Sequence, residues 1–259
     1  MGELPMSNLF RTFATFACTA ALIVPVQQAE AYDLTPIVVQ LKPNGAGSSQ
    51  TMVITNSHGV PIAIEIQAFQ RTQMPTGEDQ LEPEDEDLIV YPPQMVIPPN
   101  SSQSFRVQWV GDPAPERELA YRIVTQQLPI RFEERIDADR AADLTVRYRY
   151  EAALYILPDG AEPSARLVSV ERVRDEAGVE SLELAIVSEG TMRAILHEPV
   201  IELTAAGGSA LELTGDAITP LEGLNILPGV ERRVRIAAPA QLPPGPLSGA
   251  LTTRYVVLQ

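Results

Sequence analysis

The sequence has one cysteine, Cys18, and only two histidines, His58 and His197. Cys18 lies in an N-terminal segment that we expect to be removed, so the mature chain has neither disulfides nor a thiol nucleophile. A Ser-His-Asp arrangement would require one of the two histidines to be positioned by chance. The sequence also lacks a Gly-rich phosphate loop, a zinc-ligand spacing and a nucleophile elbow. These absences predict a protein that is not an enzyme and that binds no metal or other cofactor. Carboxylate pairs for glycoside hydrolysis stay open, because acids are plentiful.

Basic residues are also scarce. The chain has 19 Lys and Arg against 34 Asp and Glu, which gives a formal net charge of -15. Affinity for nucleic acid is supplied largely by Lys and Arg. The sequence therefore predicts that nucleic acid is not a partner, and the acidity itself indicates a solvated surface.

No apolar run is long enough to span a membrane. The longest, 12–26, has about fifteen residues and is broken by Pro25, whereas a spanning helix needs about twenty. It follows Arg11 and precedes Ala29-Glu30-Ala31, which suits a signal-peptidase site. We therefore expect a signal peptide over residues 1–31, a mature start at Tyr32, and an exported protein without stable membrane insertion.

What the sequence does contain is a series of short β-branched runs separated by turn residues. The 23 prolines and 16 glycines are scattered along the chain, which favours an all-β fold with many turns. Ile62, Ile64 and Ile66 alternate with largely polar residues, as in a half-buried strand. A chain of 259 residues suits two domains of about a hundred residues each. We place these domains at 32–158 and 159–259.

Two charged stretches interrupt this pattern. Residues 72–87 contain few apolar side chains and are expected to form a solvated loop. They lack the ligand spacing of a calcium loop. Residues 131–143 could form a short helix by propensity or a mobile charged loop, and the sequence does not decide between them.

Several motifs occur together and in order in the first half of the chain. They are Val53-Ile54-Thr55-Asn56, Leu88-Ile89-Val90-Tyr91-Pro92-Pro93, Ile97-Pro98-Pro99-Asn100, Phe105-Arg106-Val107, Glu116-Arg117-Glu118 before Tyr121-Arg122, and Leu128-Pro129. In this order they resemble the PapD-like periplasmic pilus chaperones, and the second half is similar to that family's C-terminal domain at 184–190 and 227–236. The resemblance implies two immunoglobulin-like domains in an L-shaped arrangement. It also implies a periplasmic chaperone that binds pilus subunits (pilins) and delivers them to an outer-membrane usher.

The resemblance also implies a donor strand, which completes the unfinished fold of a pilus subunit. The candidate donor residues are Leu144, Val146, Tyr148 and Tyr150, which share one face of the run 144–157. The alternative is that these side chains face the protein's own core. Alternation alone cannot say which core they fill.

The chain departs from the family where a subunit's terminal carboxylate would be held. The first strand has no Arg or Lys, and Ala153 falls where the donor strand would carry a basic residue. The candidate carboxylate anchors are instead Arg106, Arg122 and Arg147. Leu157 replaces a further basic residue, so the ion pair between the two domains is expected to be missing. These losses suggest a divergent member close to the archaic branch.

The rival function from another class is an envelope adhesin or carbohydrate-binding β-sandwich, which would expose aromatic side chains on loops. The only tryptophan, Trp109, occupies a strand position instead. A pilus subunit would be a single domain with an apolar N-terminal extension, which is not the pattern here. Whether the free protein forms a self-capping dimer, and which pilin it binds, are left open.

Overall fold

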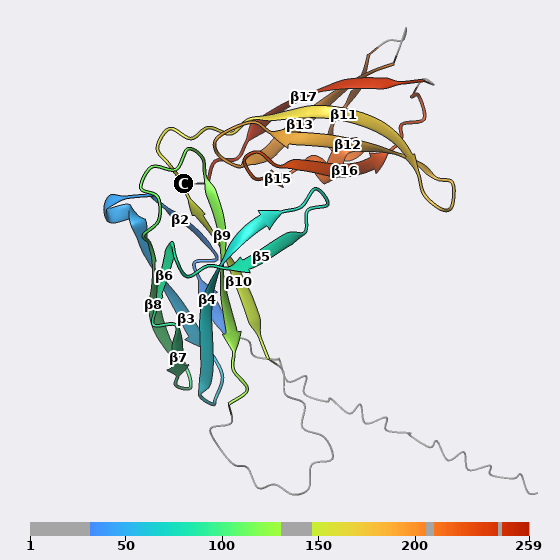
Figure 1. The fold of residues 1–259 in the computed structure, drawn as a ribbon. Coiled ribbons are helices and arrows are strands. Elements are labelled where there is room, and N and C mark those ends of the chain that lie inside the picture. The colour runs from blue at the N-terminus through green and yellow to red at the C-terminus, as the bar shows by residue number, and fades with distance from the viewer. Residues whose placement is uncertain (1–31, 131–146, 206–209, 243–244, 259) are drawn as a thin grey trace, which may run out of the picture. The chain divides into compact units, whose positions relative to one another are not determined.

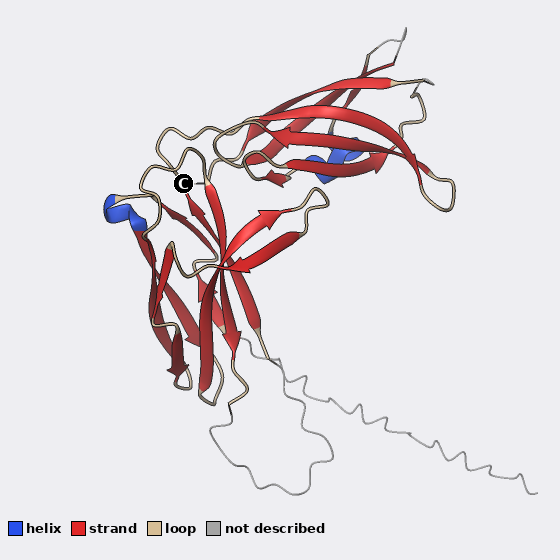
Figure 2. Ribbon diagram, viewed as in Figure 1, coloured by secondary structure: helices blue, strands red, loops and turns tan. Residues whose placement is uncertain are grey.

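The computed structural model describes residues 32–130, 147–205, 210–242 and 245–258. Ala31–Gln259 cluster as one compact unit. Strands dominate the described residues, and the only helical segments among them are two 3-10 turns, η1 (Gly45–Ser48) and η2 (Gly215–Leu221) (Figure 2). The all-β fold of two sandwiches predicted from the sequence is confirmed. The expected signal peptide and the stretch 131–143 lie outside the described residues.

The first sandwich is built from two sheets (Figure 1). Its strands are β1 (Asp33–Thr35), β2 (Val38–Leu41), β3 (Ser49–Asn56), β4 (Ile62–Gln73), β5 (Asp79–Pro83), β6 (Leu88–Tyr91), β7 (Gln94–Ile97), β8 (Ser101–Trp109), β9 (Leu119–Gln127) and β10 (Arg149–Ile156). One sheet has the order β1-β3-β8-β6. The other has the order β2-β10-β9-β4-β5, and β7 pairs with the first part of β4.

Alternating apolar residues explain how these sheets pack. Ile62, Ile64 and Ile66 of β4 are all at most 2% exposed, and Phe105 and Val107 of β8 face them from the other sheet's side of the core. Because successive strand residues point to opposite faces, such alternation fixes which face is buried. Burying each such side chain stabilises the fold by about 1.5 to 3 kcal/mol.

The chain crosses from one sheet to the other between β1 and β2. β1 pairs antiparallel with β3, whereas β2 pairs parallel with β10. Residues 36 and 37 make the crossing, and Pro36 lacks the N–H that a continuing ladder would need. Consequently the first edge strand is divided between the two sheets, and each sheet receives only a short piece of it.

The second sandwich has its own strands and core. The strands are β11 (Ala165–Arg174), β12 (Glu180–Ser188), β13 (Ala194–Ala205), β14 (Leu211–Leu213), β15 (Asn225–Ile226), β16 (Glu231–Ala237) and β17 (Leu247–Tyr255). One sheet has the order β11-β12-β16, and in the other β13 pairs with β14, β15 and β17. A separate cluster that includes Leu184, Leu196 and Ile201 forms the core between them.

One expectation about the first sandwich is wrong. The stretch 72–87 is not a plain solvated loop, because β4 continues to Gln73 and β5 runs over Asp79–Pro83, so that the two strands form a hairpin. The hairpin is stabilised by contacts to the second sandwich. The side chain of Gln73 donates to the carbonyl of Asn225 (3.0 Å) and accepts from the N–H of Leu227 (3.0 Å). Such distant partners leave no periodic apolar signal in the local sequence.

Candidate functional site: the open edge of β10 and the arginines beside it

The two halves of β10 have different neighbours. From Ala153 to Ile156 the strand is paired on both sides, with β9 and with β2. From Arg149 to Ala152 it is paired only with β9, so within the described residues its other edge is open. The open edge lies just before Ala153, the residue opposite Val38 at the start of β2, because the chain reaches this sheet only at that point.

The direction of the backbone groups along this edge follows from the paired half. The N–H of Ala153 donates to the carbonyl of Ile37 (2.9 Å), and that of Leu157 to the carbonyl of Leu41 (2.8 Å). Alternate residues of a strand direct their N–H and C=O to the same side. Glu151 and Arg149 therefore direct theirs away from β9. These unpaired groups form a template on which another strand can be added.

Two of the four candidate donor residues lie within the described part of the chain. Tyr148 and Tyr150 are partly buried and pack against the rim of the first sandwich's own core. The Tyr150 ring meets the ring of Tyr32 edge-on at 4.7 Å, and the Tyr148 ring lies 6.2 Å from that of His58. Leu144 and Val146 fall outside the described residues. The donor assignment therefore stays a prediction, and the two described tyrosines contact the domain's own core.

The Tyr32 ring packs against β10 at Tyr150. The sequence did not point to this role of Tyr32. Its side chain is fully buried, and its hydroxyl lies 2.8 Å from both the carbonyl and the hydroxyl oxygen of Thr125 on β9. Burial raises the pKa of Tyr32 to about 12, although the hydrogen bond to Thr125 acts in the opposite direction. Tyr32 therefore fixes the ring of Tyr150 to the interior of the sandwich.

The three candidate anchor arginines are not brought together. Arg106 is exposed on β8, in the sheet that does not contain β10, and its Nη2 donates to Ser49 Oγ (2.5 Å). Arg147 is exposed at the start of the described segment before β10. Arg122 is directly opposite Ala153 in the register of β9 and β10. Only Arg122 is therefore placed at the boundary between the open and the paired half of β10.

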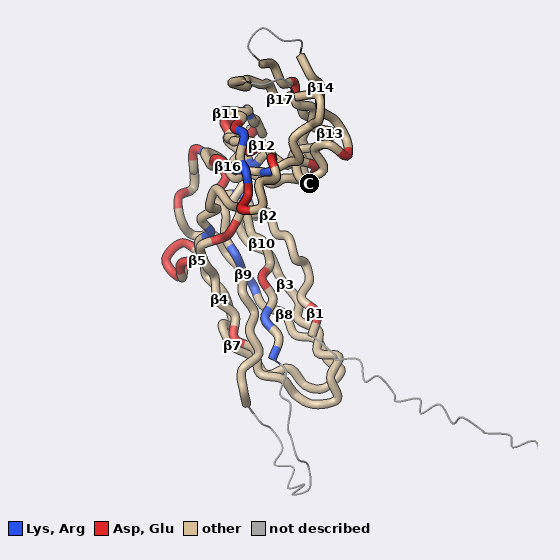
Figure 3. Tube along the Cα trace, turned by 90° about the vertical axis from the view of Figure 1, so that its right-hand side faces the viewer, with Lys and Arg blue, Asp and Glu red and all other residues tan. Residues whose placement is uncertain are grey.

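Arg122 belongs to a cluster that the sequence did not reveal. Its Nη2 donates to Asp79 Oδ2 (2.8 Å), and Arg71 Nε lies 2.8 Å from Asp79 Oδ1. Burial raises the pKa of Asp79, but the hydrogen bond from Arg122 and the nearby Arg71 guanidinium outweigh this effect and leave the pKa below its usual range. Arg232 of β16 lies near this cluster. Its pKa is lowered, mainly by burial and additionally by the positive charge of Arg71. Figure 3 shows Lys and Arg positions, in blue, along the strands labelled β9 and β10.

A second ion pair joins the two sandwiches. Arg193 Nη1 donates to Glu118 Oε2 (2.6 Å), both side chains are fully buried, and the Arg193 Cζ lies 3.8 Å from the ring centroid of Tyr155. Burial raises the pKa of Glu118 against the opposing effect of Arg193. The ion pair expected to be missing was the one whose basic residue Leu157 replaces, and the pair seen here is a different one. Leu157 is not involved, and two residues that carried no such signal supply the pair.

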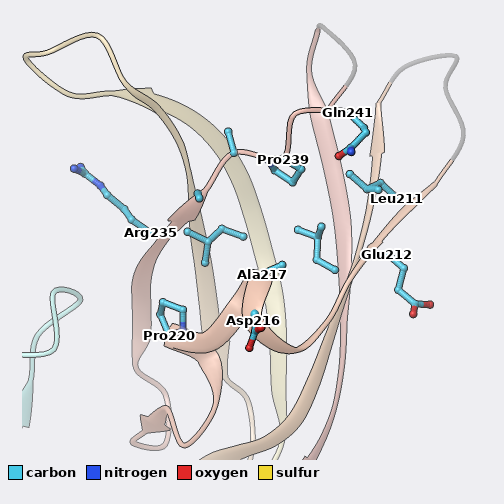
Figure 4. A pocket seen from close by; sticks show the side chains of 12 residues that line it. Leu211, Glu212, Asp216, Ala217, Pro220, Arg235, Pro239 and Gln241 are labelled. Carbon is cyan, nitrogen blue, oxygen red and sulfur yellow. The ribbon is translucent and has the colours of Figure 1, made fainter.

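The described residues line several cavities, of which two concern the site and the second sandwich. One of ≈ 200 Å³ is lined by Arg71, Gln73, Glu118 and Leu227 among others. It therefore borders both the arginine cluster around Asp79 and the Glu118–Arg193 ion pair. The larger, of ≈ 450 Å³, lies in the second sandwich beside β14, η2 and β16 (Figure 4). Its lining is mainly apolar, and Arg235 at its margin is ion-paired with Glu183 (3.0 Å).

Among the described residues, no group of three or more His, Cys, Asp or Glu is arranged to hold a metal ion. In the same part of the chain, no helix has the length and apolar character needed to cross a membrane.

Fold and site together define a class: a β protein of two sandwiches in which one edge strand is half open. Solved structures share this fold. The Class 5 fimbriae chaperone CfaA matches with a TM-score of 0.54 and 16% sequence identity, over 88% of this chain and 100% of that chain. A chain from a chaperone–tip adhesin complex of CFA/I fimbriae biogenesis matches with a TM-score of 0.53 and 18% identity, over 78% of this chain and 87% of that one. A search of the curated proteins finds no match.

The family model of the PapD N-terminal domain, described as a pili and flagellar-assembly chaperone, matches residues 34–162. The chain belongs to this family and is a PapD-like pilus assembly chaperone.

Proposed function

We propose that this protein is a periplasmic chaperone that binds pilus subunits by adding β10, and the residues that precede it, to the subunit's unfinished sheet, and that it delivers them to an outer-membrane usher. The observation that carries the proposal is the open edge of β10 over Arg149–Ala152. An exposed strand edge is normally protected, because its unpaired groups pair with other chains. An open edge in a pilus assembly chaperone is a suitable place for a subunit.

The chemistry of the edge fits this role. The backbone groups of Arg149 and Glu151 supply hydrogen bonds that do not depend on the subunit's sequence, and alternate apolar side chains supply specificity. Leu144, Val146, Tyr148 and Tyr150 remain our donor residues, and each apolar side chain that a subunit buries contributes about 1.5 to 3 kcal/mol. A structurally similar chain occurs in a chaperone–tip adhesin complex, which supports a pilus subunit as the partner.

Arg122 is our choice for the carboxylate anchor. Its register position opposite Ala153 adjoins the open edge, whereas Arg106 lies on the other sheet. A guanidinium suits a carboxylate because it can make two parallel hydrogen bonds.

Membership of a chaperone family also supports a function without catalysis. The rival of a carbohydrate-binding sandwich is not favoured, since Trp109 is 3% exposed and packs near Tyr121.

The test removes one backbone donor from the open edge. In Glu151→Pro the outward N–H is lost, and proline is tolerated on an edge strand when its nitrogen faces outward. Glu151→Ala loses the same side chain and keeps the N–H. We expect Glu151→Pro to lower the recovery of a co-expressed, affinity-tagged pilus subunit at least tenfold, and Glu151→Ala to stay near wild type.

Circular dichroism and the thermal midpoint establish that both variants are folded. Equal recovery by folded Glu151→Pro and wild type would refute binding through this edge. The donor side chains are tested separately by Val146→Asp combined with Tyr148→Asp, which we expect to abolish recovery. Unchanged recovery with the double variant would show that Val146 and Tyr148 are not donor residues. Binding through the strand edge would still be tested by Glu151→Pro.

A further inference from the structure

Asp79 is the carboxylate of a cluster that contains more than one arginine. Both of its oxygens are engaged, Oδ2 by Arg122 Nη2 and Oδ1 by Arg71 Nε, each at 2.8 Å. The Arg71 side chain is 7% exposed, that of Arg122 19% and that of Asp79 20%. One partly buried carboxylate therefore serves two partly buried guanidinium groups.

A third guanidinium increases the excess of positive charge. Arg232 of β16 donates to the carbonyl oxygens of Pro75 (3.3 Å) and Asn225 (3.4 Å) and forms no ion pair with any residue that the structure describes. It packs against the hairpin turn so closely that a side chain on Gly77 would collide with it. Three guanidinium groups thus lie around the Asp79 carboxylate, in a chain whose formal net charge is -15.

The hydrogen-bonding capacity of the cluster is not used up. Arg122 Nε is buried and has no partner among the described residues. The Arg71 Nε–Asp79 Oδ1 contact is close, but its geometry is not that of a hydrogen bond. A buried N–H without an acceptor is unfavourable, because it has lost its hydrogen bond to water. An arginine that has bonded through one edge of its fork still offers donors to a second carboxylate.

The position of Asp79 relative to the three arginines is fixed by the hairpin to which it belongs. It begins β5, and the hairpin that precedes it is attached to the second sandwich by the Gln73 side chain and by the Pro75 carbonyl, which accepts from the N–H of Arg233 (2.8 Å). The negative charge of Asp79 is therefore a fixed part of the site.

We infer that Arg71, Arg122 and Arg232 form a receptor for one carboxylate of the partner, and that Asp79 is an internal counter-ion that weakens this binding. This rests on the proposed function, and it adds a residue that limits the affinity of the site. In the free protein Asp79 balances part of the charge and keeps the arginines paired. When the partner's carboxylate binds, it lies near Asp79, and the repulsion between the two anions lowers affinity and favours release.

The size of the effect follows from Coulomb's law. Two carboxylates that share one guanidinium stand about 5 Å apart, and at that distance their repulsion in a partly solvated site raises the dissociation constant by at least about fivefold. Removal of the Asp79 charge therefore tightens binding by about five- to tenfold or more. Dissolved salt screens the repulsion, so the gain shrinks as the salt concentration rises.

The experiment compares Asp79→Asn with Glu82→Gln, using the wild-type chaperone and one purified pilus subunit. Both changes remove one negative charge from β5, but Glu82 is exposed and forms no ion pair in the described structure. We expect Asp79→Asn to lower the dissociation constant about five- to tenfold at low salt, with a smaller gain at high salt. Glu82→Gln is expected to change it by less than twofold, and Arg122→Gln to raise it.

The outcomes separate this inference from the proposed function. Weaker binding by both Asp79→Asn and Arg122→Gln would show that Asp79 positions the arginines and would overturn the inference, as would no change in either variant. In both cases the open edge stands if Glu151→Pro still abolishes binding. A wild-type affinity for Glu151→Pro would instead remove the proposed function. If Asp79→Asn does not fold, Arg232→Gln decides, because loss of the surplus cation must weaken binding for the inference to hold.

Discussion

The two halves of β10 have the same strand geometry and opposite surroundings. Ala153–Ile156 have β9 on one side and β2 on the other, and Tyr155 is 3% exposed beneath Arg193. Among the residues that the structure describes, Arg149–Ala152 have a neighbouring strand on one side only. The difference does not come from β10 but from β2, which begins at Val38 after the crossing. The placement of one short strand thus determines where the sheet is complete and where it can accept a partner.

The largest expected effect concerns the ion pair that anchors the paired half. Arg193→Ala leaves Glu118 buried without a partner and removes the cation from the Tyr155 ring. We expect the free energy of unfolding in urea to fall by about 3–5 kcal/mol. Replacement of both charges, Glu118→Leu with Arg193→Met, is expected to cost much less. A loss below about 1 kcal/mol in Arg193→Ala would contradict the view that this pair holds the paired half in place.

The two halves are compared directly by one truncation in each. Leu154 is 0% exposed, and Leu154→Ala is expected to cost about 2–5 kcal/mol through lost burial and a residual cavity. Arg149 is exposed, and its one ion pair within the described part of the chain is with Glu151, so Arg149→Ala is expected to change stability by about 0.5 kcal/mol or less. Chemical denaturation measures both. Similar losses in the two variants would mean that the halves do not differ in stability.

The smallest expected effect concerns the ring that supports the open half. Tyr32→Phe keeps the contact with Tyr150 and removes the hydrogen bond to Thr125, at a cost of about 1 kcal/mol at neutral pH. Because burial raises the pKa of Tyr32 to about 12, its contribution is complete below pH 10 and is lost as the pH rises toward 12. We expect the fall in stability over this interval to be shallower in Tyr32→Phe. An unchanged slope would assign the alkaline loss to other tyrosines.

Much of the fold was predictable because it depends on local alternation. Ile62, Ile64 and Ile66 indicate a half-buried strand by themselves, and they lie in one. The second sandwich follows the same logic, although β13 has a register shift between His197 and Val200. Alternation fails at such a bulge, because the extra residue reverses which face the next side chain occupies.

The site was predicted less completely, for a different physical reason. Arg122 was a candidate anchor, but its partners Asp79 and Arg71 were not, since they meet only after β4, β5 and β9 have paired. Glu118 and Arg193 are 75 positions apart in the sequence, and no pattern connects them. A polar residue such as Gln73 gives the same local signal whether it is solvated or bonded to another domain. Contacts between distant charged side chains depend on tertiary packing, which composition and periodicity do not encode.

The attachment of the hairpin to β16 has a consequence for the solubility of the protein. β16 is the last strand of its sheet, and the carbonyl of Pro75 occupies one of its outward N–H groups. The turn between β4 and β5 therefore covers part of an edge that could otherwise recruit a second copy of the chain. The turn thus limits pairing between copies of the protein at β16, while the edge of β10 over Arg149–Ala152 stays unpaired among the described residues.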